Sequence, residues 1–131
     1  MRKIQAQGIH HITIIGADRQ TSIEFWEGVL GMPFIFDQPN LDNPNEGHIY
    51  FDPGDGRLIT VFTDETRKAE KQRPPNGAGH LHHLAITVSQ ASFAYLKHDG
   101  DTVFSVGAVV VAGGVATFRQ LGRLQVYILP V

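Results

Sequence analysis

The first half of the chain alternates between strand-like and helix-like patterns of apolar residues. Residues 8–15 are rich in β-branched residues and lie between glycines, which is typical of a strand. Asp18 follows as a helix N-cap, and apolar residues then recur every three to four positions up to Gly31, which predicts an amphipathic helix. Further strands are predicted at 34–36, 48–52 and 57–63, and the last two form a hairpin around a turn at 53–56.

The second half of the chain repeats this order. Residues 82–88 (HHLAITV) echo residues 10–15 (HHITII) at an offset of 72 positions, and a second cap and helix follow at 89–98. Residues 122–127 echo the strand at 56–62 with one residue deleted, which aligns Gln125 with Thr60. The single domain 1–131 is therefore predicted to contain unit one at about 8–63, a charged, solvated linker at 64–79, and unit two at about 80–131.

The size of the units predicts how they pack. A unit of this length is too small to bury both faces of its own sheet. We therefore predict an α+β fold in which two βαβββ units form one curved mixed sheet, with the helices on the outer face and a ligand site on the concave face. Alternation along the strands places Ile12 and Ile14 toward the helix, and places His11 and Thr13, like His83 in unit two, toward the concave face. His10 and His82 are then expected on the helix face, in a supporting or packing role.

Composition narrows the class of protein. The 131 residues carry a formal net charge of −2 and no cysteine, which excludes a disulfide scaffold and a cysteine-based zinc site. No cluster of basic residues marks a nucleic-acid binder, and no window approaches the ~20 apolar residues of a membrane helix. The N-terminal residues lack the apolar run of a secretory signal, which predicts a cytoplasmic location. The expected partner is a small molecule.

The paired histidines, together with residues 25–32 (FWEGVLGM), resemble the vicinal oxygen chelate superfamily, which comprises glyoxalases, bleomycin-resistance proteins and extradiol dioxygenases. The resemblance covers residues 8–96, and in the first unit it is closest to ring-cleaving dioxygenases that act on hydroquinone-like or catechol-like substrates. It implies a divalent metal, held by one residue from the first strand and one from the last strand of each unit. These positions fall on His11, Thr60, His83 and Gln125. Imidazole suits Fe, Mn, Ni or Zn.

Two of these positions depart from the family pattern. Thr60 is compatible with members that use two histidines and one carboxylate. Gln125 is neutral where a carboxylate is expected, which predicts a metal site at His11, His83 and Gln125 that is weakened or lost. Because neither position 60 nor position 125 is Glu, the pattern favours a dioxygenase-like oxidoreductase over a glyoxalase. The alternative is a metal-free binding protein of the bleomycin-resistance type.

Two further predictions concern catalysis and assembly. His48 and Tyr50 share one face of their strand and are candidate proton donor and acceptor, although a solvated hairpin would carry the same pattern. The uncharged run 103–114, if it forms an edge strand, would need a partner to cover it, which predicts a homodimer.

Overall fold

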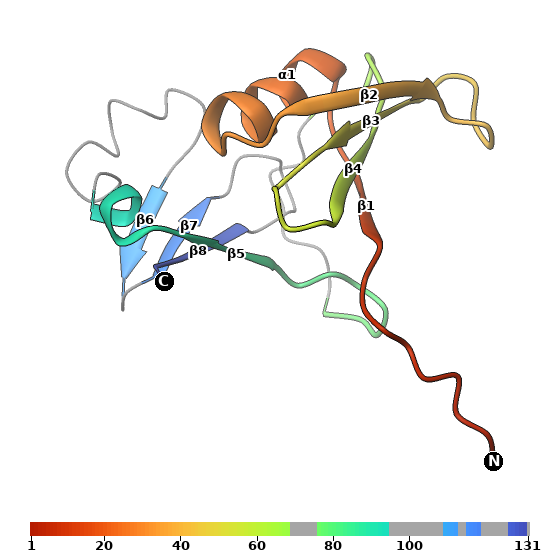
Figure 1. Ribbon diagram of the computed structural model, residues 1–131. Helices are drawn as coiled ribbons and strands as arrows, with labels where there is room; N and C mark the ends of the chain where they lie inside the picture. Colours follow the sequence, from red (N-terminus) through yellow and green to blue (C-terminus); the bar gives the residue numbers. More distant parts are fainter. Residues whose placement is uncertain (69–75, 95–108, 113–114, 119–125, 131) are drawn as a thin grey trace. The chain divides into compact units, whose positions relative to one another are not determined.

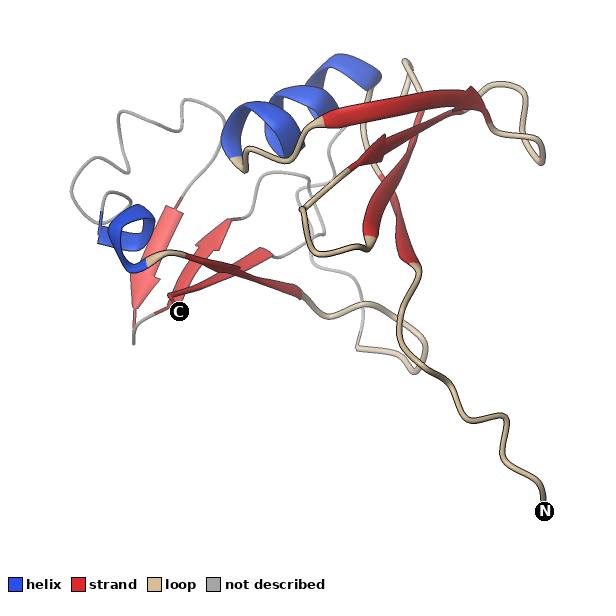
Figure 2. Ribbon diagram, in the orientation of Figure 1, coloured by secondary structure: helices blue, strands red, loops and turns tan. Residues whose placement is uncertain are grey.

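The computed structural model describes residues 1–68, 76–94, 109–112, 115–118 and 126–130 of the chain. Contacts divide the chain into two compact units, Met1–Arg67 and Lys68–Val131. Each unit contains one four-stranded sheet (Figures 1 and 2). The elements of the first unit are β1 (His11–Ile15), α1 (Arg19–Ile23), η1 (Glu24–Val29), β2 (Phe34–Pro39), β3 (Gly47–Phe51) and β4 (Leu58–Thr63).

The first sheet is mixed, with the strand order β1-β4-β3-β2. β1 runs parallel to β4, while β2, β3 and β4 pair in an antiparallel manner. β2 extends to Pro39, beyond the short strand at 34–36 that the sequence predicts. Because β2 is an edge strand, Pro39 interrupts no ladder hydrogen bond on its outer side.

The helical segment between β1 and β2 begins and ends as its sequence predicts. The Asp18 carboxylate accepts a hydrogen bond from the Thr21 N–H at 2.8 Å, which caps α1. Gly31 ends the segment with a φ of +68°, a conformation that glycine adopts without strain. Between these ends, α1 continues as the π-helix η1, which carries Phe25 and Trp26 into the core.

The core of the first unit lies between this helical segment and one face of the sheet. Trp26, Ile49, Phe51 and Val61 are completely buried, and burial of each such side chain stabilises the fold by about 1.5–3 kcal/mol. Along β1, Ile14 is buried whereas its neighbours in the strand are more exposed, which confirms the predicted alternation. The opposite face of the sheet is left open by the helix.

The second unit has the same topology. Its elements are β5 (Leu84–Val88), a helical segment at 90–94, β6 (Val109–Ala112), β7 (Val115–Phe118) and β8 (Val126–Pro130). The strand order is β5-β8-β7-β6, with β5 parallel to β8. The predicted repeat is therefore confirmed, whereas residues 95–98 of the predicted helix lie outside the described residues. The joining of both sheets into one curved sheet stays a prediction.

The strand register corrects one alignment made from the sequence. Thr13 pairs with Thr60 in the first unit, and Ala85, its counterpart at the 72-residue offset, pairs with Tyr127 in the second. Tyr127, rather than Gln125, is therefore the register counterpart of Thr60. The alignment was wrong because it matched similar residues in the two segments and allowed one deletion. The register is set instead by the pairing of β8 with its neighbouring strands. Gln125 itself lies outside the described residues.

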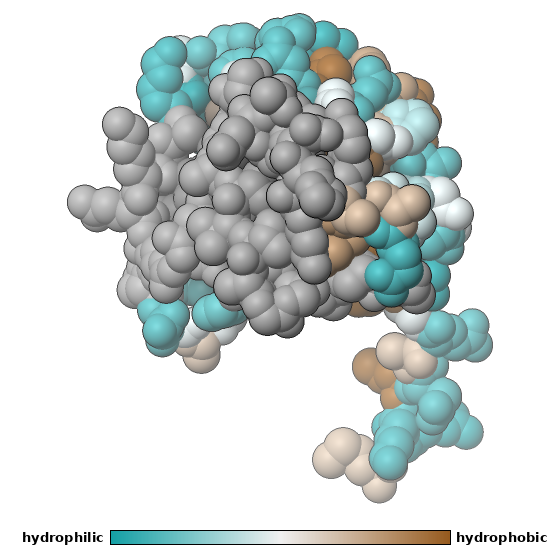
Figure 3. All heavy atoms as spheres, turned by 90° about the vertical axis from the view of Figure 1, so that its left-hand side faces the viewer, coloured by the Kyte–Doolittle hydropathy of each residue, from teal (hydrophilic) through white to brown (hydrophobic). Residues whose placement is uncertain are grey.

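The remaining features lie outside the core of the first unit. Residues 1–10 extend away from β1 as an exposed tail, which Figure 3 shows as hydrophilic surface with separate hydrophobic patches. In the second sheet β6, which lies in the uncharged run 103–114, is an edge strand. Within the part of the chain that the structure describes, no helix combines the length and the apolar character needed to cross a bilayer.

Candidate functional site

The open face of the first sheet carries a continuous set of polar side chains. Alternation along each strand brings one or two of them to this face from every strand of the sheet, and cross-strand pairing then places them side by side. We call this set the polar row. It consists of Gln38 from β2, Tyr50 and His48 from β3, Thr60 from β4, and Thr13 from β1.

Hydrogen bonds link the members of the polar row in sequence across the sheet. Gln38 Nε2 donates to the Tyr50 hydroxyl at 2.7 Å, and that hydroxyl lies 3.2 Å from His48 Nδ1. On the other side of the ring, His48 Nε2 lies 2.9 Å from the Thr60 hydroxyl, which donates to the Thr13 hydroxyl at 2.7 Å. The row thus connects the edge strand β2 with β1.

The number of protons on each group determines which group donates in each hydrogen bond of the polar row. A threonine hydroxyl has one proton, and Thr60 donates that proton to Thr13, so Thr60 must accept its other hydrogen bond from His48 Nε2–H. A neutral His48 then has an unprotonated Nδ1, which accepts from the Tyr50 O–H. Each hydroxyl therefore donates toward β1, and the Thr13 proton is left to face the open side of the sheet.

The environment of His48 favours this neutral form. Burial lowers the pKa of His48 below its usual value of 6.5, and the electrostatic influence of His11 lowers it further. The His48 ring lies between Tyr50 and Phe62, with ring centroids 4.5 Å from each. The predicted placement of His48 and Tyr50 on one face is therefore confirmed, and their role as proton donor and acceptor stays a prediction.

The two histidine pairs have closely matching local geometry. In the first unit, His10 Nδ1 and His11 Nδ1 lie 2.9 Å apart with their rings nearly perpendicular. In the second unit, the same atoms of His82 and His83 lie 2.8 Å apart in the same arrangement. All four side chains are exposed, so the expectation that His10 and His82 pack on the helix face is wrong. The contacts fit the other role expected of His10 and His82, which is to support a neighbouring histidine.

The described residues contribute unequally to a possible metal site. Thr60 is completely buried and its hydroxyl bonds both His48 and Thr13, so it does not fit as a ligand. His11 fits better, because its Nδ1 contacts His10 Nδ1 and its ring is exposed, which leaves Nε2 as the nitrogen that could bind a metal. Among the described residues there is no group of three or more His, Cys, Asp or Glu side chains that could hold an ion.

Sequence reasoning missed Gln38, Thr13 and Thr60 as members of one hydrogen-bonded set. Residues 37–47 read as a polar loop, so Gln38 was not expected in a strand. The signal that could have found it is the hairpin register, which pairs Gln38 with His48 once β2 is extended by three residues.

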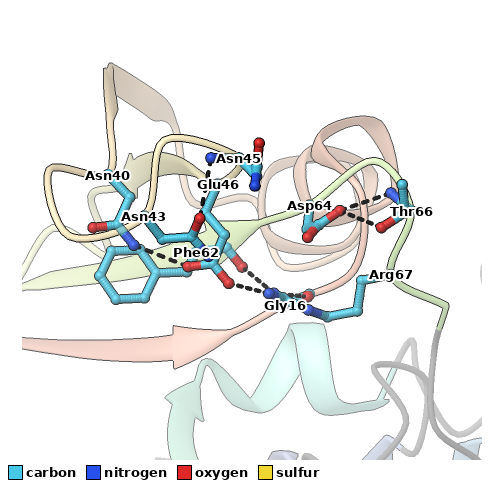
Figure 4. Close-up of polar contacts among 9 residues, drawn as sticks. All are labelled: Gly16, Asn40, Asn43, Asn45, Glu46, Phe62, Asp64, Thr66 and Arg67. Atoms are coloured by element: carbon cyan, nitrogen blue, oxygen red, sulfur yellow. Dashed lines mark hydrogen bonds and ion pairs between the residues drawn. The ribbon is translucent and has the colours of Figure 1, made fainter.

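A second polar cluster lies at the far ends of β1 and β4, and sequence reasoning missed it too. Arg67 was expected in a solvated linker, but its guanidinium donates to the Gly16 and Phe62 carbonyls at 2.9 and 3.1 Å. It also forms an ion pair with Glu46, whose other carboxylate oxygen accepts from Asn40 (Figure 4). These contacts tie Arg67 to the first unit.

Comparison with protein families gives one match over most of the chain. The model of the Glyoxalase/Bleomycin resistance protein/Dioxygenase superfamily matches residues 8–110. Among curated proteins, the candidate ring-cleaving dioxygenase MhqO of Bacillus subtilis is 37% identical over 59 residues, which are 45% of this chain and 19% of MhqO. The similarly described MhqE of the same organism is 32% identical over 60 residues, or 46% of this chain and 20% of MhqE. The matched segments thus cover about a fifth of these relatives.

Solved structures share the fold. A candidate dioxygenase from Bacillus subtilis superposes with a TM-score of 0.73 and 25% identity, over 95% of this chain and 40% of that one. The fosfomycin resistance protein FosX from Listeria monocytogenes, in complex with Mn(II) and sulfate, gives a TM-score of 0.71 at 13% identity over 97% of this chain and 94% of FosX. At that identity the likeness to FosX concerns the fold alone.

Proposed function

The chain belongs to the glyoxalase/bleomycin resistance protein/dioxygenase superfamily, and from this premise we propose that it is a metal-dependent, dioxygenase-like oxidoreductase acting on a small molecule. The observation that carries the proposal is the polar row, which ends at the Thr13 hydroxyl on the same face and strand as His11. The partial identity to MhqO and MhqE supports the ring-cleaving class.

The proposed metal ligands are His11 and His83. The third proposed ligand is Gln125, which the sequence alone suggests and which the strand register does not align with Thr60. When bound there, a divalent Fe, Mn, Ni or Zn ion would supply Lewis acidity toward two neighbouring substrate oxygens. His11 would bind through Nε2, because His10 holds its Nδ1. Gln125 contributes an uncharged amide, so we expect binding that is weaker than in a site with a carboxylate.

The proposed catalytic residues are His48 and Tyr50. Their separation of 3.2 Å and the 2.9 Å between His48 and Thr60 lie at or close to the range for proton transfer. The row can hold a proton at Thr13 beside a substrate oxygen, and His48 can return it from Nε2 through Thr60. Gln38 keeps the Tyr50 hydroxyl directed at His48, so we assign it a positioning role.

Calorimetric titration with Mn(II), Ni(II) and Zn(II) tests the proposed ligands. His11→Ala and His83→Ala should each abolish binding, and Gln125→Glu should tighten it by about 1–3 kcal/mol because it adds a charged partner. Tyr127→Glu is the matched variant, since Tyr127 is the register counterpart of Thr60. Tightening by Tyr127→Glu alone would exclude Gln125, and unchanged binding in both histidine variants would exclude the site.

A metal-free binding protein of the bleomycin-resistance type is the second candidate. Thr60 favours it, because its hydroxyl is fully used within the polar row. The rings of Tyr50 and Phe62 lie on the same face and could stack on a flat ligand. Metal analysis of the purified protein discriminates the two candidates, since this one requires a ligand-binding protein without stoichiometric metal.

We also propose a homodimer. β6 is an edge strand whose segment Val109–Ala112 is uncharged, and such an edge tends to pair with another chain. Light scattering at micromolar concentration should give about twice the chain mass of 14.4 kDa, and a mass near that of one chain would contradict the proposal. The cytoplasmic location stays a prediction.

A further inference from the structure

The segment before β5 contains an asparagine followed by a glycine, Asn76-Gly77, and both residues are exposed. We propose that Asn76 is a site of spontaneous deamidation, which converts this one asparagine to aspartate and isoaspartate in the folded protein. The proposal concerns the chemistry of this segment and does not depend on the proposed enzyme activity.

The reaction needs only water. The Gly77 backbone nitrogen loses its proton and attacks the side-chain carbonyl carbon of Asn76, and the bond from that carbon to the amide nitrogen breaks. Ammonia leaves and a cyclic imide remains. Water then opens the imide at either carbonyl, giving aspartate or the β-linked isoaspartate. Glycine favours the attack because it has no Cβ to hinder the approach of its nitrogen.

The local structure leaves both reacting groups accessible. Within the described residues, neither the Asn76 side chain nor the Gly77 N–H forms a hydrogen bond. The Gly77 carbonyl does accept a hydrogen bond from the His80 N–H at 3.2 Å, which holds residues 77–80 in a turn. The turn therefore uses the oxygen of Gly77 and leaves its nitrogen available.

The other three asparagines lie in the loop between β2 and β3, and the structure protects each one (Figure 4). Asn40 is 8% exposed, and its side chain donates to Glu46 and accepts from the Asp42 N–H. Asn43 precedes Pro44, which has no N–H to attack with. Asn45 precedes Glu46, whose N–H donates to the Asn43 carbonyl at 3.0 Å.

The products would change the segment in two ways. Either product replaces a neutral amide by a carboxylate, so the net charge becomes more negative by one unit. Isoaspartate also adds one carbon to the main chain between the first unit and β5, the strand that follows His83. Aged protein would therefore be a mixture of chains that differ in the main chain before β5.

Peptide mass spectrometry of the full-length protein, incubated under warm and mildly alkaline conditions, tests the proposal. Trypsin places Asn76 in the peptide 72–97 and the other three asparagines in the peptide 20–57, since it cuts after Lys and Arg except before Pro. We expect the amide-to-acid mass change in peptide 72–97 at a rate at least several-fold above that in peptide 20–57. Methyl transfer by a protein isoaspartyl methyltransferase should label the same peptide.

Gly77→Ala is the matched variant, and it should slow the conversion of Asn76 several-fold. Gly77 does not have a positive φ, and an added Cβ would meet only the His80 ring at 3.3 Å, so alanine fits with a small shift of that side chain. In urea, Asn76 should convert at nearly its folded rate, because the fold already exposes it. Equal rates for Asn76 and Asn45, an unchanged rate in Gly77→Ala, or a large acceleration in urea would each overturn the proposal.

Discussion

The two units share a strand order and a parallel strand pair, but they differ in the residues at matching register positions. The first unit has Gln38 and His48 paired across β2 and β3, and the second has Ala112 and Val115 paired across β6 and β7. Polar groups that build a hydrogen-bonded row in one unit are thus replaced by apolar residues in the other. The two units therefore share the strand order of the sheet but not the polar residues at this pair of positions.

The rest of the polar row also changes between the units, although two of its three counterparts keep a hydroxyl group. Register counterparts of Thr13, Tyr50 and Thr60 are Ala85, Thr117 and Tyr127. The histidine pair at the start of each unit is kept in both units. The histidine pair is therefore the part of the candidate site that the repeat preserves at matching positions.

The largest expected effect is the loss of a core ring from the first unit. Phe51 is completely buried and contacts Trp26, so Phe51→Ala should destabilise the unit by about 3–5 kcal/mol. Urea unfolding followed by the fluorescence of Trp26, the only tryptophan of the chain, measures this. Ile86→Ala in the half-exposed strand β5 is the control and should shift the Trp26 transition much less. Equal shifts would show that the two units unfold as one.

Substitution of Gly16, which follows β1 and packs closely on its neighbours, should have the next largest effect on stability. A Cβ on Gly16 would lie 2.3 Å from Val61 Cγ1 and 3.0 Å from Ser22 Oγ. Gly16→Ala should therefore cost about 1–3 kcal/mol through overpacking. Gly28→Ala is the matched control, because a Cβ there meets nothing within 4 Å, and it should leave the urea midpoint unchanged or raise it. A neutral Gly16→Ala variant would contradict the packing described above.

Removal of one hydroxyl group from the polar row should lower the stability of the fold and change the tautomer of His48. Thr60→Val keeps the shape of the side chain but removes the partner of His48 Nε2, which should cost about 1–2 kcal/mol. The ¹⁵N shifts of the His48 ring should then lose the pattern of a fixed Nε2–H tautomer. Tyr127→Phe at the counterpart position of the second unit should leave those shifts unchanged. If the wild-type ring carries its proton on Nδ1, the direction assigned to the row is wrong.

The pH dependence of stability should show the smallest effect. The pKa of folded His48 lies below its unfolded value of about 6.5, because burial disfavours the charged ring. Its contribution is therefore fully present above pH 6.5 and is lost as the pH falls through the lower folded value. Thermal melts of His48→Gln should show a weaker loss of stability on acidification than the wild type. Identical acid dependence in both would refute the shift.

Local rules predicted most of the elements in the first unit. Asp18 caps α1 and Gly31 ends the helical segment because these residues satisfy or permit particular backbone geometries, which short sequence windows reveal. Alternation in β1 and β3 likewise placed Ile14 in the core and His48 with Tyr50 on the opposite face. The second copy was found because its histidine strand repeats the first.

Contacts between residues that are far apart in the chain could not be predicted from the sequence. Arg67 is separated from Gly16 by 51 positions, so a charged run gave no sign that it packs on the ends of two strands. The bond from Thr60 to Thr13 depends on the register of a parallel pair 47 positions apart. The alignment of Gln125 failed for the same reason, because register is a property of the folded sheet and not of one strand.

The hydrogen bonds and the ion pair of Arg67, the last residue of the first unit, are all made within that unit. Its guanidinium bonds the Gly16 and Phe62 carbonyls and Glu46, and all of these partners precede Lys68 in the chain. A change of connection after this residue therefore breaks none of those bonds. In an evolving lineage, the segment that follows could therefore change in length without loss of the contacts that close the first unit.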